Sequence, residues 1–120
     1  MEGKAHNFKE LRVWKGGMDM VDLCYDFVQD LPNNEKYNLV SQIVRCGNSI
    51  PANIAERCGK RTKRHFAEFV TTSLSSCFEL ETYLLICERR SFGNEELRNK
   101  MLAKVLELKN MIHGFRETLN

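Results

Sequence analysis

Residues 39–58, LVSQIVRCGNSIPANIAERC, decide the fold. Apolar residues recur in this stretch at steps of three and four, as they do on one face of a helix: Leu39, Ile43, Cys46, Ile50 and Ile54. Pro51 lies inside the predicted helix and has no N–H to donate to the carbonyl of Gly47, so the helix should kink or locally unwind at a cost of ~3 kcal/mol. Packing against other helices must offset this cost.

Helical spacing continues on both sides of this stretch, and turn-forming residues interrupt it. Pro32 precedes the central helix and Gly59 ends it, Thr62 can cap the next helix, and Gly93 with Asn94 separates the last two. The predicted helices cover about residues 10–31, 35–58, 63–90 and 95–118. Helices of similar length with short links pack antiparallel to their sequence neighbours. The sequence therefore predicts an all-α fold, an up-down-up-down antiparallel four-helix bundle.

Each of the other three helices has its own apolar stripe. In the first helix we expect the inward residues to be Leu11, Trp14, Met18, Val21, Tyr25 and Val28, with Leu31 closing the stripe. In the third they are Phe66, Val70, Ser73, Cys77, Leu80, Leu84 and Cys87, and in the fourth Leu97, Met101, Val105, Leu108, Ile112, Phe115 and Leu119. The heptad spacing of the last two helices predicts that they lie along their neighbours at a shallow angle.

Small residues indicate where helices can approach closely. Gly16 and Gly17 would each weaken the first helix by roughly 1 kcal/mol relative to alanine, so they suggest a close approach or a helix held by its neighbours. The middle of the third helix, TTSLSSC, is made mostly of small residues. We expect this segment to lie opposite Gly47, Ala52 and Ala55 of the central helix.

The composition is that of an ordinary globular protein, with 28% charged residues and a net charge of +2. Because 120 residues suffice for one core, we expect a single domain over residues 1–120, with residues 1–8 as a loose arm. No apolar run has the length of a signal peptide or a membrane span, which favours a cytoplasmic protein without membrane contact. The cysteines are interpreted as reduced thiols in or near the core: Cys24, Cys46, Cys58, Cys77 and Cys87.

Three segments in order along the chain, FKELRVW, SQIVRCGNSIPANIAE and FAEFVTTSLSSCFELETYL, resemble a known family. It comprises the four-helix bundle proteins named after the 23S ribosomal RNA intervening sequences. The resemblance implies a bundle that assembles into a pentameric ring. It also points to a relative, the accessory variability determinant of diversity-generating retroelements, which binds a reverse transcriptase and nucleic acid. Most members of the family have no established activity.

The resemblance assigns no catalytic residue to this chain. The matching polar positions are Arg45, Ser49, Asn53 and Glu56 in the second helix and Glu79, Glu81 and Thr82 in the third, together with Pro51. The chain departs from the family pattern at Arg57, where glycine is usual, and at Gly47 and Asn48, where a small apolar pair is more common.

The polar residues of the central helix form a stripe beside its apolar one. This stripe is expected to join two acidic residues of the third helix in a network: Arg45, Ser49, Asn53, Glu56, Glu79 and Glu81. Arg45 is the expected partner of Glu81, because a charge left alone away from water costs about 3 to 5 kcal/mol. We favour a buried network that fixes helix register and satisfies the carbonyls freed by Pro51. A catalytic or binding dyad is the alternative.

A basic run, RCGKRTKRH, covers residues 57–65. Its five basic residues, with no acidic residue among them, are Arg57, Lys60, Arg61, Lys63 and Arg64. The whole chain has a net charge of only +2, so the rest of the chain is acidic. Positive side chains at the start of a helix oppose its dipole and do not stabilise it locally. In a ring, repeated basic tips would form a phosphate-binding rim, whereas a solvated loop is the alternative.

An acidic line runs along the first helix: Asp19, Asp22, Asp26 and Asp30. A solvated face is the favoured interpretation, followed by a contact with basic residues of a neighbouring subunit, and last by a metal site. Di-metal bundles use Glu-x-x-His pairs, which this sequence lacks, and no cysteine pair has zinc spacing. We therefore predict no metal and no cofactor.

Known catalytic motifs are absent from the sequence, since it contains neither a glycine-rich phosphate loop nor a nucleophile elbow. The favoured hypothesis is a non-enzymatic oligomer, expected to be a homopentamer, that binds RNA or DNA or holds a nucleic-acid enzyme such as a reverse transcriptase. The alternative is a purely structural or protein-interaction bundle. An enzyme that uses the polar residues of the central helix is the least favoured hypothesis.

Overall fold

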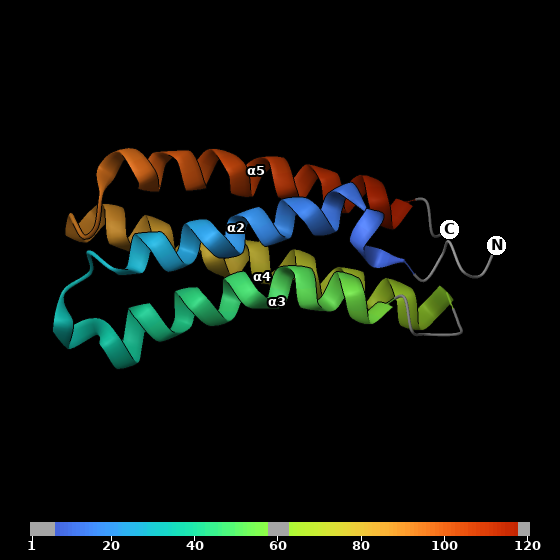
Figure 1. The fold of residues 1–120 in the computed structure, drawn as a ribbon, viewed down its shortest axis with the longest axis horizontal. Coiled ribbons are helices and arrows are strands. Elements are labelled where there is room, and N and C mark those ends of the chain that lie inside the picture. Colours follow the sequence, from blue (N-terminus) through green and yellow to red (C-terminus); the bar gives the residue numbers. More distant parts are fainter. Residues whose placement is uncertain (1–6, 58–62, 118–120) are drawn as a thin grey trace.

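The computed structural model describes residues 7–57 and 63–117 of the chain (Figure 1). Four long α-helices make up most of this part: α2 (Arg12–Val28), α3 (Ser41–Arg57), α4 (Lys63–Arg90) and α5 (Glu95–Glu117). Three short helical segments accompany them, η1 (Phe8–Glu10), η2 (Asn33–Glu35) and the π-helix η3 (Lys36–Val40). Neither described range contains a strand, so the all-α prediction is confirmed. None of the helices in these ranges is long and apolar enough to cross a membrane.

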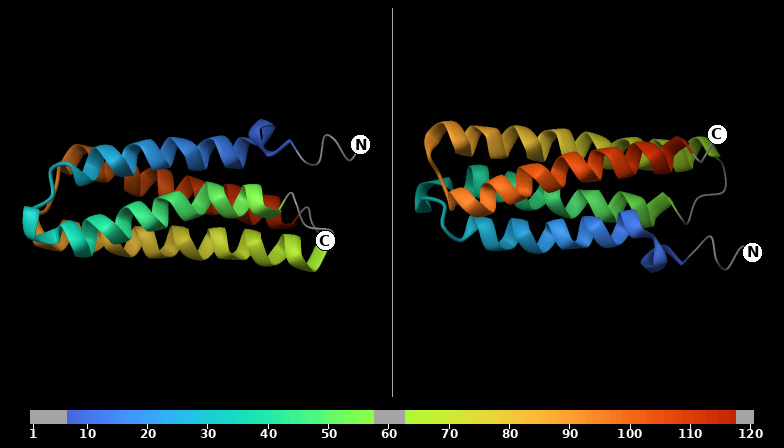
Figure 2. Two further views of the ribbon diagram at one scale, coloured as in Figure 1. Left: turned by 60° about the horizontal axis from the view of Figure 1, so that its bottom comes forward. Right: turned by 90° about the horizontal axis from the view of Figure 1, so that it is seen from above.

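Successive long helices run in opposite directions, as Figures 1 and 2 show. α3 packs against α2 and α4, and α5 packs against α4 and α2, so the helices follow one another around the bundle. The arrangement is the predicted up-down-up-down antiparallel bundle, with dimensions of 47 × 23 × 21 Å. The ends of the central and third helices agree with the sequence. Gly59 and Thr62, the predicted cap residues between them, lie outside the described residues.

The predicted stripe of the first helix was wrong. α2 and the turn after it bury Val13, Gly17, Met20, Cys24, Phe27 and Leu31. Of the residues expected inside, Leu31 is buried as predicted, whereas Met18 and Tyr25 are 40% and 48% exposed and the others are half-buried. The true stripe has the same helical spacing but contains a glycine and a cysteine, which carry too little apolar area to be recognised as core positions. Their small size is what brings α2 close to α3.

Three glycines mark the close contacts of α2. A Cβ on Gly17 would lie 3.3 Å from the ring of Pro51, and one on Gly16 would lie 3.1 Å from Leu108 of α5. A Cβ on Gly47 would lie 2.7 Å from the sulfur of Cys24. The close approach suggested by Gly16 and Gly17 is therefore confirmed. Gly47, however, faces α2 and not the small residues of α4, and Ala52 is exposed, so the predicted opposition of these residues to α4 was wrong.

The central helix remains α-helical on both sides of Pro51 and does not unwind there. Its irregular part is instead at its beginning, where η2 and the π-helix η3 precede α3. π-Helical turns are rare, and this one was not foreseen from the sequence. The predicted inward residues of α3 are all buried, so the apolar stripe that decided the fold is confirmed: Leu39, Ile43, Cys46, Ile50 and Ile54.

The core of α4 and α5 also follows the predicted spacing. α4 buries Val70, Ser73, Cys77, Leu80, Leu84 and Cys87, while α5 buries Met101, Val105, Leu108 and Ile112. Phe66, Leu97 and Phe115 are half-buried at the ends of these stripes, and Leu119 lies outside the described residues. The sequence analysis missed Arg98, which is buried and donates a hydrogen bond from Nη1 to the carbonyl of Phe92 at 2.9 Å. This bond ties the α4–α5 turn to the start of α5.

The four described cysteines are free and buried, as expected, and Cys58 lies outside the described residues. Loss of hydration on burial disfavours the thiolate and raises the pKa values of Cys24 and Cys77 from the ordinary 9.0 to about 12. The same cause raises the pKa values of Cys46 and Cys87 to about 11. These thiols therefore act as small apolar core groups and not as nucleophiles.

The α4–α5 turn depends on a glycine in the left-handed region. Gly93 has φ +82°, and a Cβ on it would lie 2.5 Å from the ring of Phe27. Asn94 then caps α5, since its Oδ1 accepts a hydrogen bond from the N–H of Leu97 at 2.8 Å. The predicted stop at Gly93 and the cap at Asn94 are both confirmed.

Gly93→Ala should lower the free energy of unfolding by more than about 1 kcal/mol, because the new Cβ would be strained in this backbone conformation and would clash with a core ring. Gly114→Ala is the matched control. Gly114 lies in α5 with open space around it, so alanine there should be neutral or stabilise by up to about 1 kcal/mol. Urea unfolding followed by circular dichroism measures both. Equal effects of the two changes would contradict this account of the turn.

The buried thiols also predict how stability depends on pH. In the unfolded chain the thiols lose their protons near pH 9, whereas in the folded chain they keep them up to pH 11 or 12. The contribution of the buried thiols to the free energy of unfolding should thus be complete below pH 9. It should be lost as the pH rises to 11 or 12, by up to about 1.4 kcal/mol per thiol and pH unit. Urea unfolding between pH 8 and about 11 tests this. The Cys24→Ala/Cys77→Ala variant should lose stability less steeply, and an unchanged slope would contradict the assignment.

Candidate functional site

The polar stripe of α3 meets α4 on the surface of the bundle. Arg45 donates from Nη2 to Oε2 of Glu79 at 3.1 Å and from Nε to Gln42 at 3.0 Å. The side chains of Arg45 and Glu79 are 53% and 48% exposed, and Glu56 is exposed as well. The network is therefore not buried at these positions, contrary to the prediction. An exposed ion pair of this kind stabilises by less than about 1 kcal/mol.

The predicted pairing of Arg45 with Glu81 was wrong. Glu81 points toward α5, where its Oε1 accepts a bond from Nζ of Lys109 at 2.6 Å. The same ammonium group lies 4.6 Å from the ring centre of Phe78. Glu79 and Glu81 are two residues apart on a helix and thus point toward different neighbours, so only one of them can reach α3. The sequence pattern alone did not show which one does.

Near Pro51, short hydrogen bonds form within α3 and between α3 and α4. Asn53 donates from Nδ2 to the carbonyl and to Oγ of Ser49, at 2.8 and 2.9 Å. Ser73 donates from Oγ to the carbonyl of Ile50 at 2.9 Å, and the hydroxyl of Ser76 donates to that of Ser49 at 2.8 Å. These bonds satisfy buried or half-buried hydroxyl groups and the carbonyls of Ser49 and Ile50, and none of them goes to the carbonyl of Gly47, which Pro51 leaves without its helical donor. They agree with the predicted role in helix register, whereas the predicted satisfaction of the carbonyl freed by Pro51 stays a prediction.

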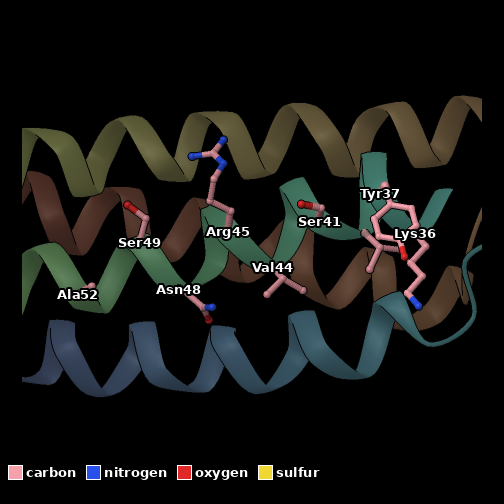
Figure 3. A pocket seen from close by; sticks show the side chains of 9 residues that line it. Lys36, Tyr37, Ser41, Val44, Arg45, Asn48, Ser49 and Ala52 are labelled. Atoms are coloured by element: carbon pink, nitrogen blue, oxygen red, sulfur yellow. The ribbon is translucent and has the colours of Figure 1, made fainter.

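The geometry of this polar stripe favours a structural role over a catalytic one. The recorded bonds of Ser49 go to an amide and to another hydroxyl, and neither group can take up its proton as a general base would. Arg45 and Ser49 do border an open groove of about 700 Å³ on α3 (Figure 3), but Arg45 is paired with Glu79, and Ser49 is hydrogen-bonded to Asn53 and Ser76. We conclude that Ser49, Asn53, Ser73 and Ser76 fix the register of α3 against α4.

The basic run joins α3 to α4 at one end of the bundle. Arg57 is the last residue of α3, and Lys63 and Arg64 begin α4, whereas Lys60 and Arg61 lie outside the described residues. Figure 1 shows that α2 begins and α5 ends at this same end. The position of the run is therefore set by the antiparallel topology, which gathers one terminus of every long helix there.

Further basic side chains lie at this end, and the sequence analysis did not connect them with the run. Lys9, Arg12, Lys15 and His65 are exposed, and the half-buried Arg116 bonds to Thr71 at 3.3 Å. We name these residues, together with Arg57 at the end of α3 and Lys63 and Arg64 at the start of α4, the basic end. At the opposite end the acidic residues Asp26, Asp30, Glu35, Glu88, Glu95 and Glu96 are accompanied by the basic residues Lys36, Arg89, Arg90, Arg98 and Lys100. The bundle is thus charged unequally along its length.

The acidic line lies exposed along α2. Asp19 and Asp22 share a surface hollow of about 340 Å³ with Lys100 and Lys104 of α5. Lysines of the same chain thus accompany the first half of the line, which agrees with the favoured interpretation as a solvated face. In residues 7–57 and 63–117, no three histidine, cysteine or acidic side chains are grouped so that they could hold a metal ion.

These features describe an all-helical bundle whose polar stripe is structural and whose charge is concentrated at its ends. Residues 9–114 match the family described as 23S rRNA-intervening sequence protein, and the chain belongs to this family. The family resemblance noted in the sequence is thereby confirmed.

The fold is similar to a crystal structure from Bacteroides thetaiotaomicron, that of a protein of unknown function from the S23 ribosomal protein family. The two have a TM-score of 0.77 and 20% sequence identity, and the match covers 87% of this chain and 97% of the other. At 20% sequence identity, this similarity shows a shared fold and nothing about function. A comparison with curated proteins finds no match.

The two ion pairs of α4 should differ in their contribution to stability. Glu81→Gln should lower the free energy of unfolding by about 1 to 2 kcal/mol, because Lys109 is only 14% exposed and would lose its charged partner. Glu79→Gln should cost less than about 1 kcal/mol, because its pair with Arg45 is hydrated. Urea unfolding of both variants measures the difference, and a larger loss for Glu79→Gln would contradict it.

Proposed function

We propose that the protein is a non-enzymatic, cytoplasmic, oligomeric bundle of one domain over residues 1–120, and that its basic end binds the phosphate backbone of RNA or DNA. The observation that carries this proposal is that each of the four long helices has a basic residue near its terminus at the same end of the bundle. A single basic loop is often only solvated. Basic residues from separate helices and from the run, brought together by the fold, are stronger support.

The proposed binding is electrostatic and independent of sequence. Lysine and arginine side chains displace the counterions that surround phosphates, which gives affinity but little base specificity. The excess of positive charge at the basic end would orient the bundle with that end toward the polyanion. Assembly into a ring, for which we propose five copies, would multiply the number of phosphates contacted.

A nucleic-acid enzyme such as a reverse transcriptase is the partner class that we propose for an accessory role on the same nucleic acid. A purely structural or protein-interaction role is the second candidate, which is favoured by the exposed apolar residues Phe78, Leu85 and Ile86 on α4. We do not propose an enzymatic role, because Arg45, Asn53 and Glu81 each have a sufficient structural function.

Neutralising the basic run should weaken nucleic-acid binding and reduce its dependence on salt. In fluorescence anisotropy with labelled single-stranded and duplex RNA and DNA, the Arg61→Gln/Lys63→Gln/Arg64→Gln variant should lower the slope of log affinity against log salt by up to about 3. The control variant, Arg89→Gln/Arg90→Gln/Lys100→Gln, removes the same charge far from the basic end and should bind like the parent.

Two outcomes would overturn the proposal. One is no binding of any of the four probes at low salt. The other is an equal loss in both variants, which would mean that only the net charge matters and that the basic end is not a site.

A further inference from the structure

Of the glycines that the structure describes, Gly114 alone has open space around it. It lies inside α5, and a Cβ on it would meet nothing within 4 Å beyond the backbone of its own helix. Glycine weakens a helix relative to alanine, so a glycine inside a helix usually allows another element to approach closely. Gly16, Gly17 and Gly47 each lie against a side chain of another helix. Gly114 does not, and its effect is to leave space at the surface of the bundle.

This space is part of a hollow of about 370 Å³ between the start of α2 and the end of α5. On the α5 side, Met111 and Phe115 lie four residues apart on one face of the helix, and Gly114 leaves a gap beside them. Leu11 and Val13 line the other side. Leu11, Met111 and Phe115 are half-buried, so each still presents part of its apolar surface to solvent.

The segment before α2 holds its side of the hollow in place. The rings of Phe8 and Trp14 pack edge to face with their centroids 5.4 Å apart, which holds η1 against α2. The N–H of Leu11 also donates to the carbonyl of Phe8 at 3.0 Å. Glu10, Leu11 and Arg12 therefore have fixed backbone positions, and the hollow is already formed before anything binds to it.

The residues that border the hollow are nearly neutral together, whereas their surroundings are basic. Glu10 and Arg12 both line it and are both exposed, so their charges balance. Other members of the basic end lie on the same elements, Lys9 on η1, Lys15 on α2 and Arg116 on α5. Phosphates would find partners among these cations but not on the apolar lining of the hollow. The hollow is therefore suited to an apolar group that is attached to phosphates.

We infer that this hollow takes up one unpaired base of a single-stranded nucleic acid whose phosphates lie on the basic end. The inference rests on the proposed function and names the form of nucleic acid that is bound. An unpaired base has a flat face that can stack on Phe115 and contact Leu11 and Met111. Proteins that bind single strands combine such stacking contacts with a basic surface. A base in a duplex is already paired and stacked, and it could enter the hollow only after leaving the double helix.

The size of the hollow favours a single base over a larger occupant. Its volume of about 370 Å³ is near the lower limit of the ~300 to 1,000 Å³ that small-ligand sites occupy. A partner helix needs a groove several turns long, whereas the lining residues of α5 extend over little more than one turn. Glu10 beside the hollow can accept a hydrogen bond from the amino group of a base such as cytosine.

Two labelled strands of the same length and charge separate the effect of the bases from that of the phosphates. One is a single strand of deoxycytidines, and the other is the same sugar-phosphate chain without bases. In fluorescence anisotropy at low salt, the protein should bind the strand with bases about 5- to 100-fold more tightly, as expected for one base stacked on an aromatic ring. Both affinities should fall with salt at the same slope, because both strands carry the same phosphates.

Filling the hollow should remove this difference. Gly114→Leu and Gly114→Gln each place a side chain in the open space, and both residues favour a helix, so circular dichroism should still show a folded bundle. Each variant should bind the deoxycytidine strand only as tightly as the parent binds the strand without bases. Ala103→Leu is the matched control, because it adds a leucine at an exposed position of α5 about three turns before Gly114. It should bind both strands like the parent.

Three results would overturn the inference. Equal affinities of the parent for the two strands would do so and would leave the proposed function standing, because both strands would then be held by their phosphates. A folded Gly114 variant that keeps the preference for bases, or that loses affinity for both strands alike, would also overturn it. Absence of binding to either strand at low salt would overturn the inference and the proposed function together.

Discussion

Gly17 of α2 lies against Pro51 of α3, while Gly47 of α3 lies against Cys24 of α2. Each glycine provides the space that the opposite residue fills, so the two helices approach closely at two points one to two turns apart. A proline inside a helix is costly by itself. Here its ring becomes part of the core, where burial and contact with α2 offset the lost hydrogen bond. The rest of the bundle depends on this contact, since it fixes the rotation of α3 about its own axis.

Once the rotation of α3 about its axis is fixed, the directions in which its other faces point are fixed as well. The side that carries Ser49 and Asn53 turns toward α4, where Ser73 and Ser76 meet it with hydroxyl groups of matching size. The side that carries Val44 and Ala52 turns outward, where nothing in the described part of the chain covers it. The hydrogen bonds to α4 and the open apolar groove are therefore both consequences of the way in which α3 packs against α2.

The sequence alone predicted helix type, helix limits and topology well, because long amphipathic patterns and turn residues determine them locally. The prediction was less successful for contacts that depend on how two helices are placed relative to each other. The stripe of α2 was placed one position away because Gly17 and Cys24 contribute size complementarity and little apolar area. The partner of Arg45 was misassigned because Glu79 and Glu81 are both glutamates of the same helix. They differ only in the direction in which their side chains leave it. The basic end was only partly recognised, because Arg12, Lys15 and Arg116 join the run through topology and not through sequence proximity.

The bundle separates its surfaces by physical character. Charge is found at the ends and along α2 and α5, where water or a polyanion can solvate it, while the α3–α4 side is neutral and shaped. This division matters because the charged pair on the α3–α4 side, Arg45 and Glu79, is neutral as a pair, whereas the basic end keeps an excess of positive charge. The close packing of α2 against Pro51 is what turns Val44 and Ala52 outward and leaves the groove on α3 open.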